Sequence, residues 1–423
     1  MIMMNLAGAQ LTENELMRLT VSNIAQATSL PTLIQEHGRW CCQRCGDRKP
    51  VQLPDGRFYC SACVSLGRLT NRDLLYRFEQ PHRHVGDGLL TWHGTLTPAQ
   101  QKASTALQTS VTAGVDHLIW AVTGAGKTEM LFPTISQMVQ QGKRVAIVSP
   151  RIDVIRELAP RLRTAFATTP IAVRYGGHFD QTDSDLVLAT VHQLLRFHRA
   201  FDLIVVDEVD AFPMAGTPML HRAVQGARRG PVVYLTATPD RPLKAAMRKG
   251  LMVSRLFRRF HGHPLPVAAI RLMNFKKLPS QLPPAIVKWV RDVVATGRSC
   301  LLFVPKISWA PQIAALVQRN GLRVAGVAST DRLRAEKITA FRQRQIQVLV
   351  TTTILERGVT VPRCAVGVVA AADRAFTASA LVQIAGRAGR AADSADDPVV
   401  FFTDRYTLAL LTAKRQIVMM NGR

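Results

Sequence analysis

Short apolar runs recur along most of the chain and are separated by segments of helix length. Between residues 91 and 255 the runs are rich in branched and aromatic residues, as expected for buried strands. They are HLIWAV (117–122), RVAIVS (144–149), IAVRY (171–175), LVLAT (186–190), LIVVD (203–207) and VVYLT (232–236). Strands that alternate with helices in this way predict a parallel, doubly wound α/β sheet, which binds ligands at the carboxyl ends of its strands.

The same alternation returns between residues 256 and 423, so the pattern predicts a second α/β lobe of similar size. Its strand-like runs are SCLLFVP (299–305), RVAGVAS (323–329), QVLVTTT (347–353), VGVVAAA (366–372) and PVVFFTD (398–404). The 423 residues are enough for two or three domains. We therefore expect an N-terminal module over residues 1–90 and lobes over residues 91–255 and 256–423.

The N-terminal module carries four cysteines in two close pairs. Cys42-x-x-Cys45 and Cys60-x-x-Cys63 are separated by 14 residues, which is typical of a Cys₄ zinc ribbon. The intervening VQLPDGRFYC predicts a hairpin that turns at Asp55-Gly56. Cys41 is the alternative to Cys42 as a ligand, although the x-x spacing favours Cys42.

The excess of basic residues suggests a binding partner for this module and for the whole chain. The protein has 54 Lys and Arg against 29 Asp and Glu, a net charge of +25, which points to a polyanionic partner, nucleic acid before a membrane surface. Within the module, basic residues lie among aromatic ones, a mixture suited to phosphate contact and base stacking. A zinc-stabilised module that packs against a neighbouring domain is the equally weighted alternative.

The sequence AVTGAGKT, residues 121–128, lies between a predicted strand and a predicted helix. Backbone N–H groups of such a loop, with the helix dipole, bind a polyphosphate. Lys127 would reach the β and γ phosphates and Thr128 would place its hydroxyl on Mg²⁺. Ala121 stands where the strict pattern has a glycine.

Acidic and hydroxyl residues follow two later strands. Asp207-Glu208-Val209-Asp210 ends LIVV, and Thr236-Ala237-Thr238 ends VVYL. Asp207 would hold Mg²⁺ and Glu208 would orient or deprotonate the attacking water. The threonines would link the nucleotide site to a nucleic-acid path. Gln100, about 25 residues before the phosphate loop, is a candidate for the adenine edge, but TPAQ is also typical of a helix start.

The second lobe carries two further motifs. Residues 351–358, TTTILERG, end a predicted strand, and residues 383–390, QIAGRAGR, hold two arginines three positions apart. On one helical face these arginines would reach the γ-phosphate; Arg390 is the first choice for the transition-state contact, with Arg387 beside it. Between the lobes, ten basic residues and no acidic one lie from Arg241 to Lys277. This connector either faces the nucleic acid or is an ordinary solvated linker.

In this order, AVTGAGKT, DEVD, TAT, TTTILERG and QIAGRAGR resemble the motifs of superfamily 2 helicases. The resemblance implies two RecA-like motor lobes and contacts to DNA from SPRIDVIREL (149–158) and ATVHQLLRF (189–197), through Arg151, Thr190 and Gln193. Helix-start and core roles are the alternatives for these residues. The predicted nucleotide contacts are Gln100, Thr123, Gly124, Ala125, Gly126, Lys127, Thr128 and Gly358.

An N-terminal CQRC…YCSAC ribbon before a two-lobe motor, with ALVQIAGRAGR near the end, resembles the ComFA family of competence proteins. The resemblance implies a motor on incoming single-stranded DNA at a membrane DNA-uptake channel, with a phosphoribosyltransferase-like competence protein as partner. In primosomal helicases the cysteines lie inside the C-terminal lobe, which disfavours that relative. The N-terminus lacks a basic secretory region, and no apolar run reaches ~18 residues. A cytoplasmic location follows, peripheral to the inner face of the membrane if the resemblance holds.

The sequence thus predicts an ATP hydrolase that uses ATP, Mg²⁺ and Zn²⁺ and translocates on single-stranded DNA during natural competence. A primosomal-type helicase, an RNA-directed helicase and a non-motor protein that uses ATP to hold nucleic acid are the alternatives. The motifs are compatible with a monomer and with a homo-oligomer.

Overall fold

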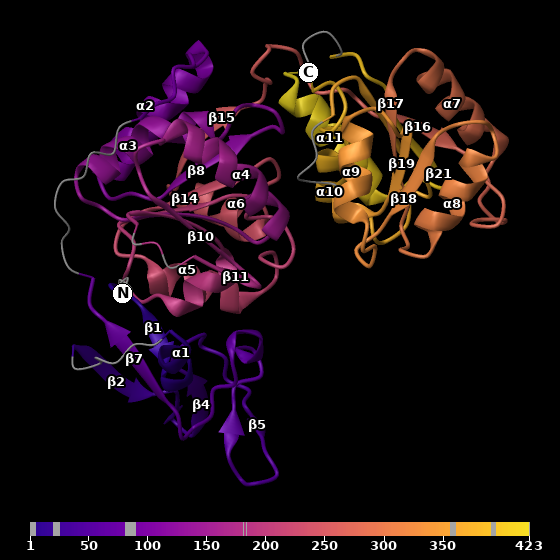
Figure 1. Cartoon of the computed structure of the whole chain (residues 1–423). Coiled ribbons are helices and arrows are strands. Elements are labelled where there is room, and N and C mark those ends of the chain that lie inside the picture. The colour runs from indigo at the N-terminus through magenta and orange to yellow at the C-terminus, as the bar shows by residue number, and fades with distance from the viewer. Residues whose placement is uncertain are drawn as a thin grey trace. The chain divides into compact units, whose positions relative to one another are not determined.

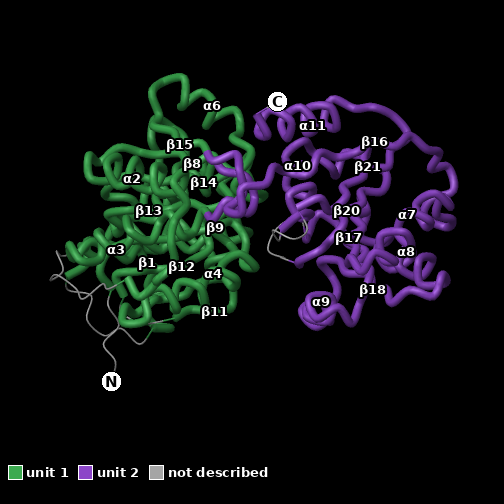
Figure 2. Tube along the Cα trace, turned by 90° about the horizontal axis from the view of Figure 1, so that it is seen from above, with its two compact units in different colours: residues 1–120, 127–255 green, residues 121–126, 256–423 purple. Residues whose placement is uncertain are grey.

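The computed structural model of the protein describes residues 6–19, 26–80, 90–180, 182, 184–355, 361–390 and 395–422. These residues form two compact units (Figure 2). The first unit contains residues 1–120 and 127–255, and the second contains residues 121–126 and 256–423. The N-terminal module and most of the first predicted lobe therefore belong to one compact unit, while residues 121–126 of that lobe group with the second unit.

The N-terminal module is built from short antiparallel strands (Figure 1). Its three-stranded sheet has the order β1-β7-β2, and two hairpins, β3-β4 and β5-β6, lie between β2 and β7 in sequence. The elements are β1 (Gln10–Thr12), α1 (Glu13–Arg18), β2 (Ala27–Pro31), β3 (Leu33–Glu36), β4 (Arg39–Cys42), β5 (Val51–Gln52), β6 (Phe58–Tyr59), the 3-10 helix η1 (Val64–Leu66) and β7 (Leu74–Phe78). Val51 pairs with Tyr59 and Gly56 has φ +82°, which confirms the predicted hairpin and its turn.

The rest of the first unit is an eight-stranded sheet in the order β11-β10-β12-β9-β13-β14-β8-β15. From β10 to β8 neighbouring strands are parallel, as predicted. The strands are β8 (His117–Ala121), β9 (Val145–Ser149), β10 (Ile171–Tyr175), β11 (His178–Phe179), β12 (Leu186–Thr190), β13 (Leu203–Val206), β14 (Val232–Thr236) and β15 (Met252–Leu256). The helices are α2 (Pro98–Thr112), η2 (Glu129–Leu131), α3 (Phe132–Gln140), α4 (Ile152–Ala165), η3 (Val191–Arg196), α5 (Pro218–Ala227) and α6 (Arg241–Arg248).

The second unit is built on a six-stranded parallel sheet in the order β16-β21-β20-β17-β19-β18. Helices lie on both faces of this sheet (Figure 1). The strands are β16 (Ala269–Leu272), β17 (Ser299–Phe303), β18 (Val324–Val327), β19 (Val348–Thr351), β20 (Cys364–Val368) and β21 (Val399–Thr403). The helices are α7 (Pro284–Ala295), α8 (Trp309–Gln318), α9 (Arg334–Arg342), η4 (Thr353–Leu355), α10 (Ala378–Ala385) and α11 (Leu408–Met420).

The central strands of the two large sheets are buried along their whole length. Every residue of β9, β12 and β13 is buried, as is every residue of β17, β19, β20 and β21. Continuous apolar runs are therefore the expected sequence of these strands. The predicted fold class, two RecA-like parallel-sheet lobes with an N-terminal Cys₄ module, is confirmed.

None of the helices among the residues that the structure describes is both long and apolar enough to span a membrane.

Candidate functional site

The glycine loop follows β8 directly, as the strand–loop–helix pattern predicts. Gly124 and Gly126 have φ values of +84° and +72°, a conformation in which only glycine is free of a Cβ penalty. Thr128 is the N-cap residue of the short helix η2, and α3 continues from Phe132. Lys127 and Thr128 are half-buried. The loop therefore joins a strand to a helical segment, with its lysine and threonine at the start of that segment.

The first part of this loop packs within the second compact unit. Thr123 Oγ1 donates to Gln383 Oε1 over 3.0 Å, and the Phe260 backbone N–H donates to the Gly124 carbonyl over 3.1 Å. A Cβ on Gly386 would come within 2.9 Å of Thr123 Oγ1. The glycine at position 386 thus allows the QIAGRAGR segment to lie directly against the loop.

The acidic motif lies at the carboxyl end of β13, as predicted. The Asp207 N–H donates to the Val148 carbonyl over 2.7 Å, and Asp207 Oδ1 accepts from the Glu208 N–H over 2.8 Å. Glu208 has φ +55°, a left-handed conformation that is uncommon for a residue with a Cβ. Backbone strain of this kind is often concentrated at functional sites.

The third acid of DEVD connects this motif to the neighbouring strand. Thr236 Oγ1 donates to Asp210 Oδ1 over 2.7 Å, and Thr238 Oγ1 donates to Asp210 Oδ2. Sequence reasoning named both threonines but gave Asp210 no role of its own. The structure shows that Asp210 is the acceptor that joins the two strand ends.

Gln100 has the helix-start role that the sequence left open. Thr97 caps α2, and the Gln100 side-chain oxygen accepts from the Thr97 N–H over 2.8 Å in a capping box. Gln100 is buried. Its contact with adenine stays a prediction.

The arginines of QIAGRAGR do not share a helical face, so that expectation is wrong. Helix α10 ends at Ala385 with Gly386 as its C-cap, and Gly389 has φ +65°, which takes the backbone out of the helix. Arg387 is buried, whereas Arg390 is half-buried and donates through Nε to the Gly386 carbonyl over 3.1 Å. Of the two, Arg390 is the more accessible.

An arginine from outside the QIAGRAGR motif supports this turn. Arg259 is buried, and its guanidinium donates to the Gly389 carbonyl and, over 3.3 Å, to the Gly386 carbonyl. Burial lowers the pKa of Arg259 to about 10, although the charge of Asp397 opposes the shift. Asp397 Oδ2 accepts from the Gly389 N–H over 3.2 Å. At least one member of the basic connector therefore points into the protein, which sequence reasoning missed.

The TTTILERG segment is described only in part. Thr351 and Thr352 are buried at the end of β19. The predicted contact Gly358, with Glu356 and Arg357, lies outside the described residues.

The residues proposed for DNA contact are placed differently from one another. Arg151 is half-buried at the start of α4. Thr190 and Gln193 are both buried, and Gln193 Oε1 accepts from Arg196 Nη1 over 2.5 Å. Thr190 and Gln193 therefore have the core role that was the alternative to DNA contact. Of the three residues, only Arg151 is partly exposed.

The four cysteines of the paired motif meet in one buried group. Their sulfur atoms all lie within 4.8 Å of one another, with 3.4 Å between Cys45 and Cys60 and 3.9 Å between Cys42 and Cys63. Four thiolates around zinc, with Zn–S bonds of about 2.3 Å, leave similar sulfur–sulfur separations, and a disulfide needs about 2.05 Å. Cys41 is buried outside the group. The residues present fit a tetrahedral zinc ion, with Cys42 and not Cys41 as the ligand.

A buried ion triad joins the first cysteine knuckle to the motor lobe. Arg44, between Cys42 and Cys45, donates through Nη2 to the two carboxylate oxygens of Glu15 over 2.8 and 2.9 Å and through Nε to the Leu195 carbonyl over 3.0 Å. Arg196 Nε donates to Glu15 Oε1 over 2.9 Å. The module therefore packs on η3, the segment from which DNA contacts were expected.

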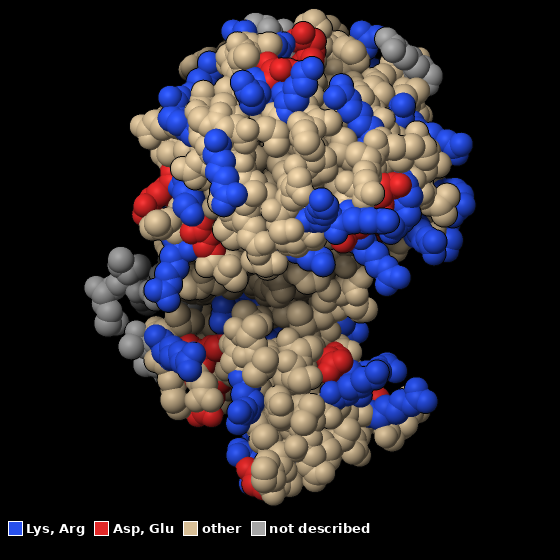
Figure 3. All heavy atoms as spheres, turned by 90° about the vertical axis from the view of Figure 1, so that its right-hand side faces the viewer, with Lys and Arg blue, Asp and Glu red and all other residues tan. Residues whose placement is uncertain are grey.

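Basic side chains are widely spread over the face of the molecule that Figure 3 draws. On the face drawn in Figure 3, Lys and Arg extend across many elements rather than forming a single cluster. A dispersed positive surface supplies salt-dependent attraction for a polyanion but does not by itself mark one binding path.

Comparisons with known proteins agree with the motifs. The helicase conserved C-terminal domain matches residues 285–392, and the family described as type III restriction enzyme, res subunit, matches residues 93–241. A mycobacterial helicase, Lhr of Mycobacterium smegmatis bound to single-stranded DNA and AMP-PNP, has a TM-score of 0.57 at 19% identity, covering 78% of this chain and 48% of that one. RecG bound to a three-way DNA junction has a TM-score of 0.55 at 18% identity, covering 78% of this chain and 45% of that one. These likenesses establish the fold.

Two curated relatives extend over nearly the whole chain. Competence protein ComFA of Bacillus subtilis is 42% identical over 90% of this chain and 86% of its own length. Competence protein ComFA of Streptococcus pneumoniae is 38% identical over 98% of this chain and 97% of its own length. The S. pneumoniae match covers so much of this chain that it includes the cysteine module as well as both lobes. The chain therefore belongs to the ComFA family of competence-associated superfamily 2 helicases, which are ATP-hydrolysing enzymes.

Proposed function

We propose that this protein is a DNA-dependent ATPase that translocates on single-stranded DNA and drives the import of transforming DNA during natural competence. Membership of the ComFA family, in both lobes and in the cysteine module, is the observation that carries the proposal. The M. smegmatis helicase Lhr, which shares this fold, is bound to single-stranded DNA and AMP-PNP, and this supports the same ligand class here. The net charge of +25 supports a polyanionic ligand.

The helicase domains imply ATP and Mg²⁺ as cofactors. In this proposal Lys127 binds the β and γ phosphates, Thr128 and Asp207 bind Mg²⁺, and Glu208 activates water. Arg390, with Arg387 behind it, stabilises charge that develops on the γ-phosphate. The remaining proposed nucleotide contacts are Gln100, Thr123, Gly124, Ala125, Gly126 and Gly358.

The cysteine group binds Zn²⁺ in this proposal, through Cys42, Cys45, Cys60 and Cys63. The metal supplies a fixed crosslink between two knuckles, so its chemistry is structural, as expected for a closed site with four protein ligands. We further propose domains over residues 1–90, 91–255 and 256–423. The proposed partners are a membrane DNA-uptake channel and a phosphoribosyltransferase-like competence protein, with the enzyme at the inner face of the membrane.

The experiment that tests the function is ATP hydrolysis without nucleic acid and with single-stranded DNA, duplex DNA or RNA, at two salt concentrations. We expect the largest stimulation from single-stranded DNA, and less of it at the higher salt concentration because phosphate contacts release counterions. Equal rates in all conditions would overturn DNA-dependent hydrolysis and leave a nucleotide switch. A larger stimulation by RNA would replace the DNA proposal with an RNA-directed one.

A matched variant tests the site. Glu208→Gln keeps the size of the side chain and removes the carboxylate that activates water, so turnover should fall by about 10²-fold or more. Nucleotide binding, measured with a fluorescent ATP analogue, should persist because Lys127 and Thr128 are unchanged. Full turnover in purified Glu208→Gln protein would remove Glu208 from the catalytic role.

A further inference from the structure

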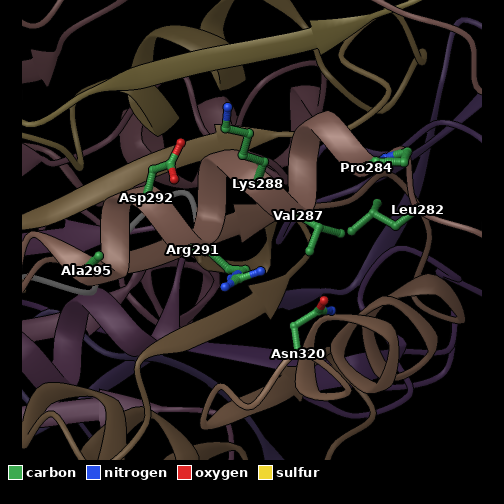
Figure 4. Close-up of a pocket in the computed structure, with 8 residues that line it drawn as sticks. All are labelled: Leu282, Pro284, Val287, Lys288, Arg291, Asp292, Ala295 and Asn320. Atoms are coloured by element: carbon green, nitrogen blue, oxygen red, sulfur yellow. The ribbon is translucent and has the colours of Figure 1, made fainter.

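Two of the cavities among the described residues differ in the charges that line them. The larger, about 730 Å³, lies along α7 in the second unit and is lined by Lys288, Arg291 and Asp292 among others (Figure 4). Its charges are of both signs, and the side chains that carry them are exposed on α7. The smaller, about 270 Å³, lies in the first unit where the cysteine module packs on the motor lobe. Its lining includes Arg44, Arg77, His198 and Arg222 and contains no acidic residue.

We infer that this smaller cavity is a binding site for a terminal phosphate group, a phosphate monoester, outside the ATP site. Three arginines from three elements converge on it: Arg44 from the first cysteine knuckle, Arg77 from β7 and Arg222 from α5. The guanidinium group matches phosphate oxygens with two parallel donors and cannot lose its charge near neutral pH. Convergent arginines with no acidic partner in the lining are therefore the expected composition of a phosphate site.

Hydrogen bonds hold Arg44 in place beside the cavity. The side chain of Arg44 has no exposed surface, and Glu15 and the Leu195 carbonyl occupy its Nη2 and Nε atoms. Its Nη1 atom is buried and, among the residues that the structure describes, has no hydrogen-bond partner. Arg44 therefore adds positive charge beside the cavity, and the donors that a ligand can reach come from Arg77, which is half-buried, and Arg222, which is exposed.

Hydrogen bonds hold Arg77 in place, and packing places Arg222 beside the first cysteine knuckle. Arg77 Nε donates to Gln10 Oε1 over 2.8 Å, and Arg77 Nη2 donates to the Gln43 carbonyl over 3.1 Å. The side chain of Arg222 lies so close to Gly46 that a Cβ at position 46 would collide with it. The glycine after the first cysteine pair therefore leaves room for an arginine from α5 beside the knuckle.

The pKa values of two residues that line the cavity, Arg77 and His198, are lowered in part by neighbouring positive charges. Burial and then the charge of Arg222 lower the pKa of Arg77. Burial, followed by the charges of Arg77 and Arg199, lowers the pKa of His198 to about 4. His198 is therefore neutral at pH 7, and the arginines carry the positive charge.

Size and charge favour a terminal phosphate over a phosphodiester. Pockets for drug-sized ligands occupy about 300–1,000 Å³, so a cavity of 270 Å³ takes a phosphate with little more than its attached sugar. A monoester carries about −1.5 to −2 charges at pH 7 and three acceptor oxygens, whereas a phosphodiester carries one charge and must leave the site in two directions. Two sources supply this chemistry, the end of a DNA strand and a free phosphate or nucleotide.

The test uses the full-length, zinc-loaded protein with the substitution Lys127→Ala. This substitution weakens phosphate binding at the glycine loop, so the measured binding reports the cavity. The first arm measures the thermal unfolding temperature in sodium phosphate and in sodium chloride at equal ionic strength. The second arm measures fluorescence anisotropy of a 3′-labelled oligo-dT that carries either a 5′-phosphate or a 5′-hydroxyl. We expect protection by phosphate and about fivefold tighter binding of the 5′-phosphorylated strand, from two or three charge-assisted hydrogen bonds.

The variants Arg222→Gln and Arg77→Gln should each reduce both effects, while Arg163→Gln, which removes an exposed arginine on α4, should leave them intact. Arg222 is exposed, so its variant is expected to fold normally, and its unfolding temperature in chloride checks this. Protection by phosphate with no preference for the 5′-phosphate would support the site and identify a free phosphate as its ligand. Absence of both effects, or effects that survive in both cavity variants, would overturn the inference.

This result is separable from the proposed motor activity because Lys127→Ala protein is not asked to hydrolyse ATP. A failure of single-stranded DNA to stimulate hydrolysis in the unmodified enzyme would leave the phosphate preference unaffected. Conversely, loss of the phosphate preference would leave DNA-stimulated hydrolysis standing.

Discussion

Arg44 and Arg259 are two buried arginines that support loops in different units, and they are stabilised in different ways. Arg44 has a carboxylate partner, Glu15, at 2.8 Å and supports the first cysteine knuckle. Arg259 donates to two backbone carbonyls of the turn that contains Arg387 and Arg390, and burial lowers its pKa to about 10. Each loop therefore depends on a buried guanidinium group.

The two kinds of partner predict different losses of stability when the arginine contacts are removed. Removing one member of a buried ion pair leaves the other charge without compensation, which is costly. Removing a charge that is bound only by carbonyl groups leaves neutral acceptors, which costs less. We therefore expect the cysteine module to be the more sensitive of the two regions, and four measurements order the effects.

The largest effect should follow loss of a cysteine ligand. Cys60→Ser removes one of the four grouped sulfurs, and the free energy of structural zinc binding, of order 10 kcal/mol, contributes to folding. We expect loss of bound zinc, measured by metal analysis, together with a lower unfolding temperature of the first unit. Cys41→Ser is the matched control because Cys41 lies outside the group, and it should retain zinc. Zinc loss in Cys41→Ser protein would show that Cys41, and not Cys42, is the zinc ligand.

The next effect should come from Glu15→Gln. Arg44 and Arg196 would both lose the carboxylate that they share, and the free energy of unfolding of the first unit should fall by about 3–5 kcal/mol. Urea unfolding followed by circular dichroism measures the change, with Glu13→Gln, an exposed residue of the same helix, as control. A loss below about 1 kcal/mol, the scale of an exposed ion pair, would show that the triad is not the main attachment of the module.

A smaller effect is expected from Arg259→Met in the second unit. The carbonyls of Gly386 and Gly389 would lose their donor, and the free energy of unfolding should fall by about 1–3 kcal/mol. The turnover number for ATP should fall as well, because the turn that positions Arg390 would be less well defined. Arg258→Met removes an exposed neighbouring arginine and should leave both quantities near their starting values. Equal behaviour of the two variants would remove Arg259 from this supporting role.

The smallest and most gradual effect is the pH dependence of the Glu15 contribution. Burial raises the pKa of Glu15, but the charge and hydrogen bonds of Arg44, together with the charge of Arg196, hold it below its ordinary value of 4.5. Because the folded-state pKa is lowered, the stabilisation is complete above pH 4.5 and is lost as the pH falls through the folded-state pKa.

The measurement compares urea unfolding of the unmodified protein and of Glu15→Gln at about pH 6, 4.5 and 3.5, values that bracket the ordinary pKa of a glutamate. Other titrating groups act equally in both proteins, so the difference in unfolding free energy reports Glu15. The difference should be largest at the highest pH, slightly smaller near pH 4.5, where about half of Glu15 is protonated in the unfolded chain, and smallest at the lowest pH. A constant difference at all three would mean that the Glu15 charge does not supply the stabilisation.

The sequence by itself determined the fold class and the local chemistry of the motifs. Continuous apolar runs predicted the parallel strands because strands that are covered on both faces have no exposed side. The glycine loop, the acidic strand end at Asp207 and the paired cysteines are short-range patterns, so their spacing is readable without a structure. The hairpin between the cysteine pairs was predictable for the same reason, since Asp55-Gly56 fixes a turn locally.

Only the tertiary structure decided which residues support these motifs. Arg44 and Leu195 lie 151 positions apart, and Arg259 and Gly389 lie 130 positions apart, so no local pattern connects them. The same holds for Asp210, whose partners lie at the end of the next strand of the sheet. A buried polar side chain takes its role from the partners that satisfy it, and the folded chain supplies those partners from distant segments.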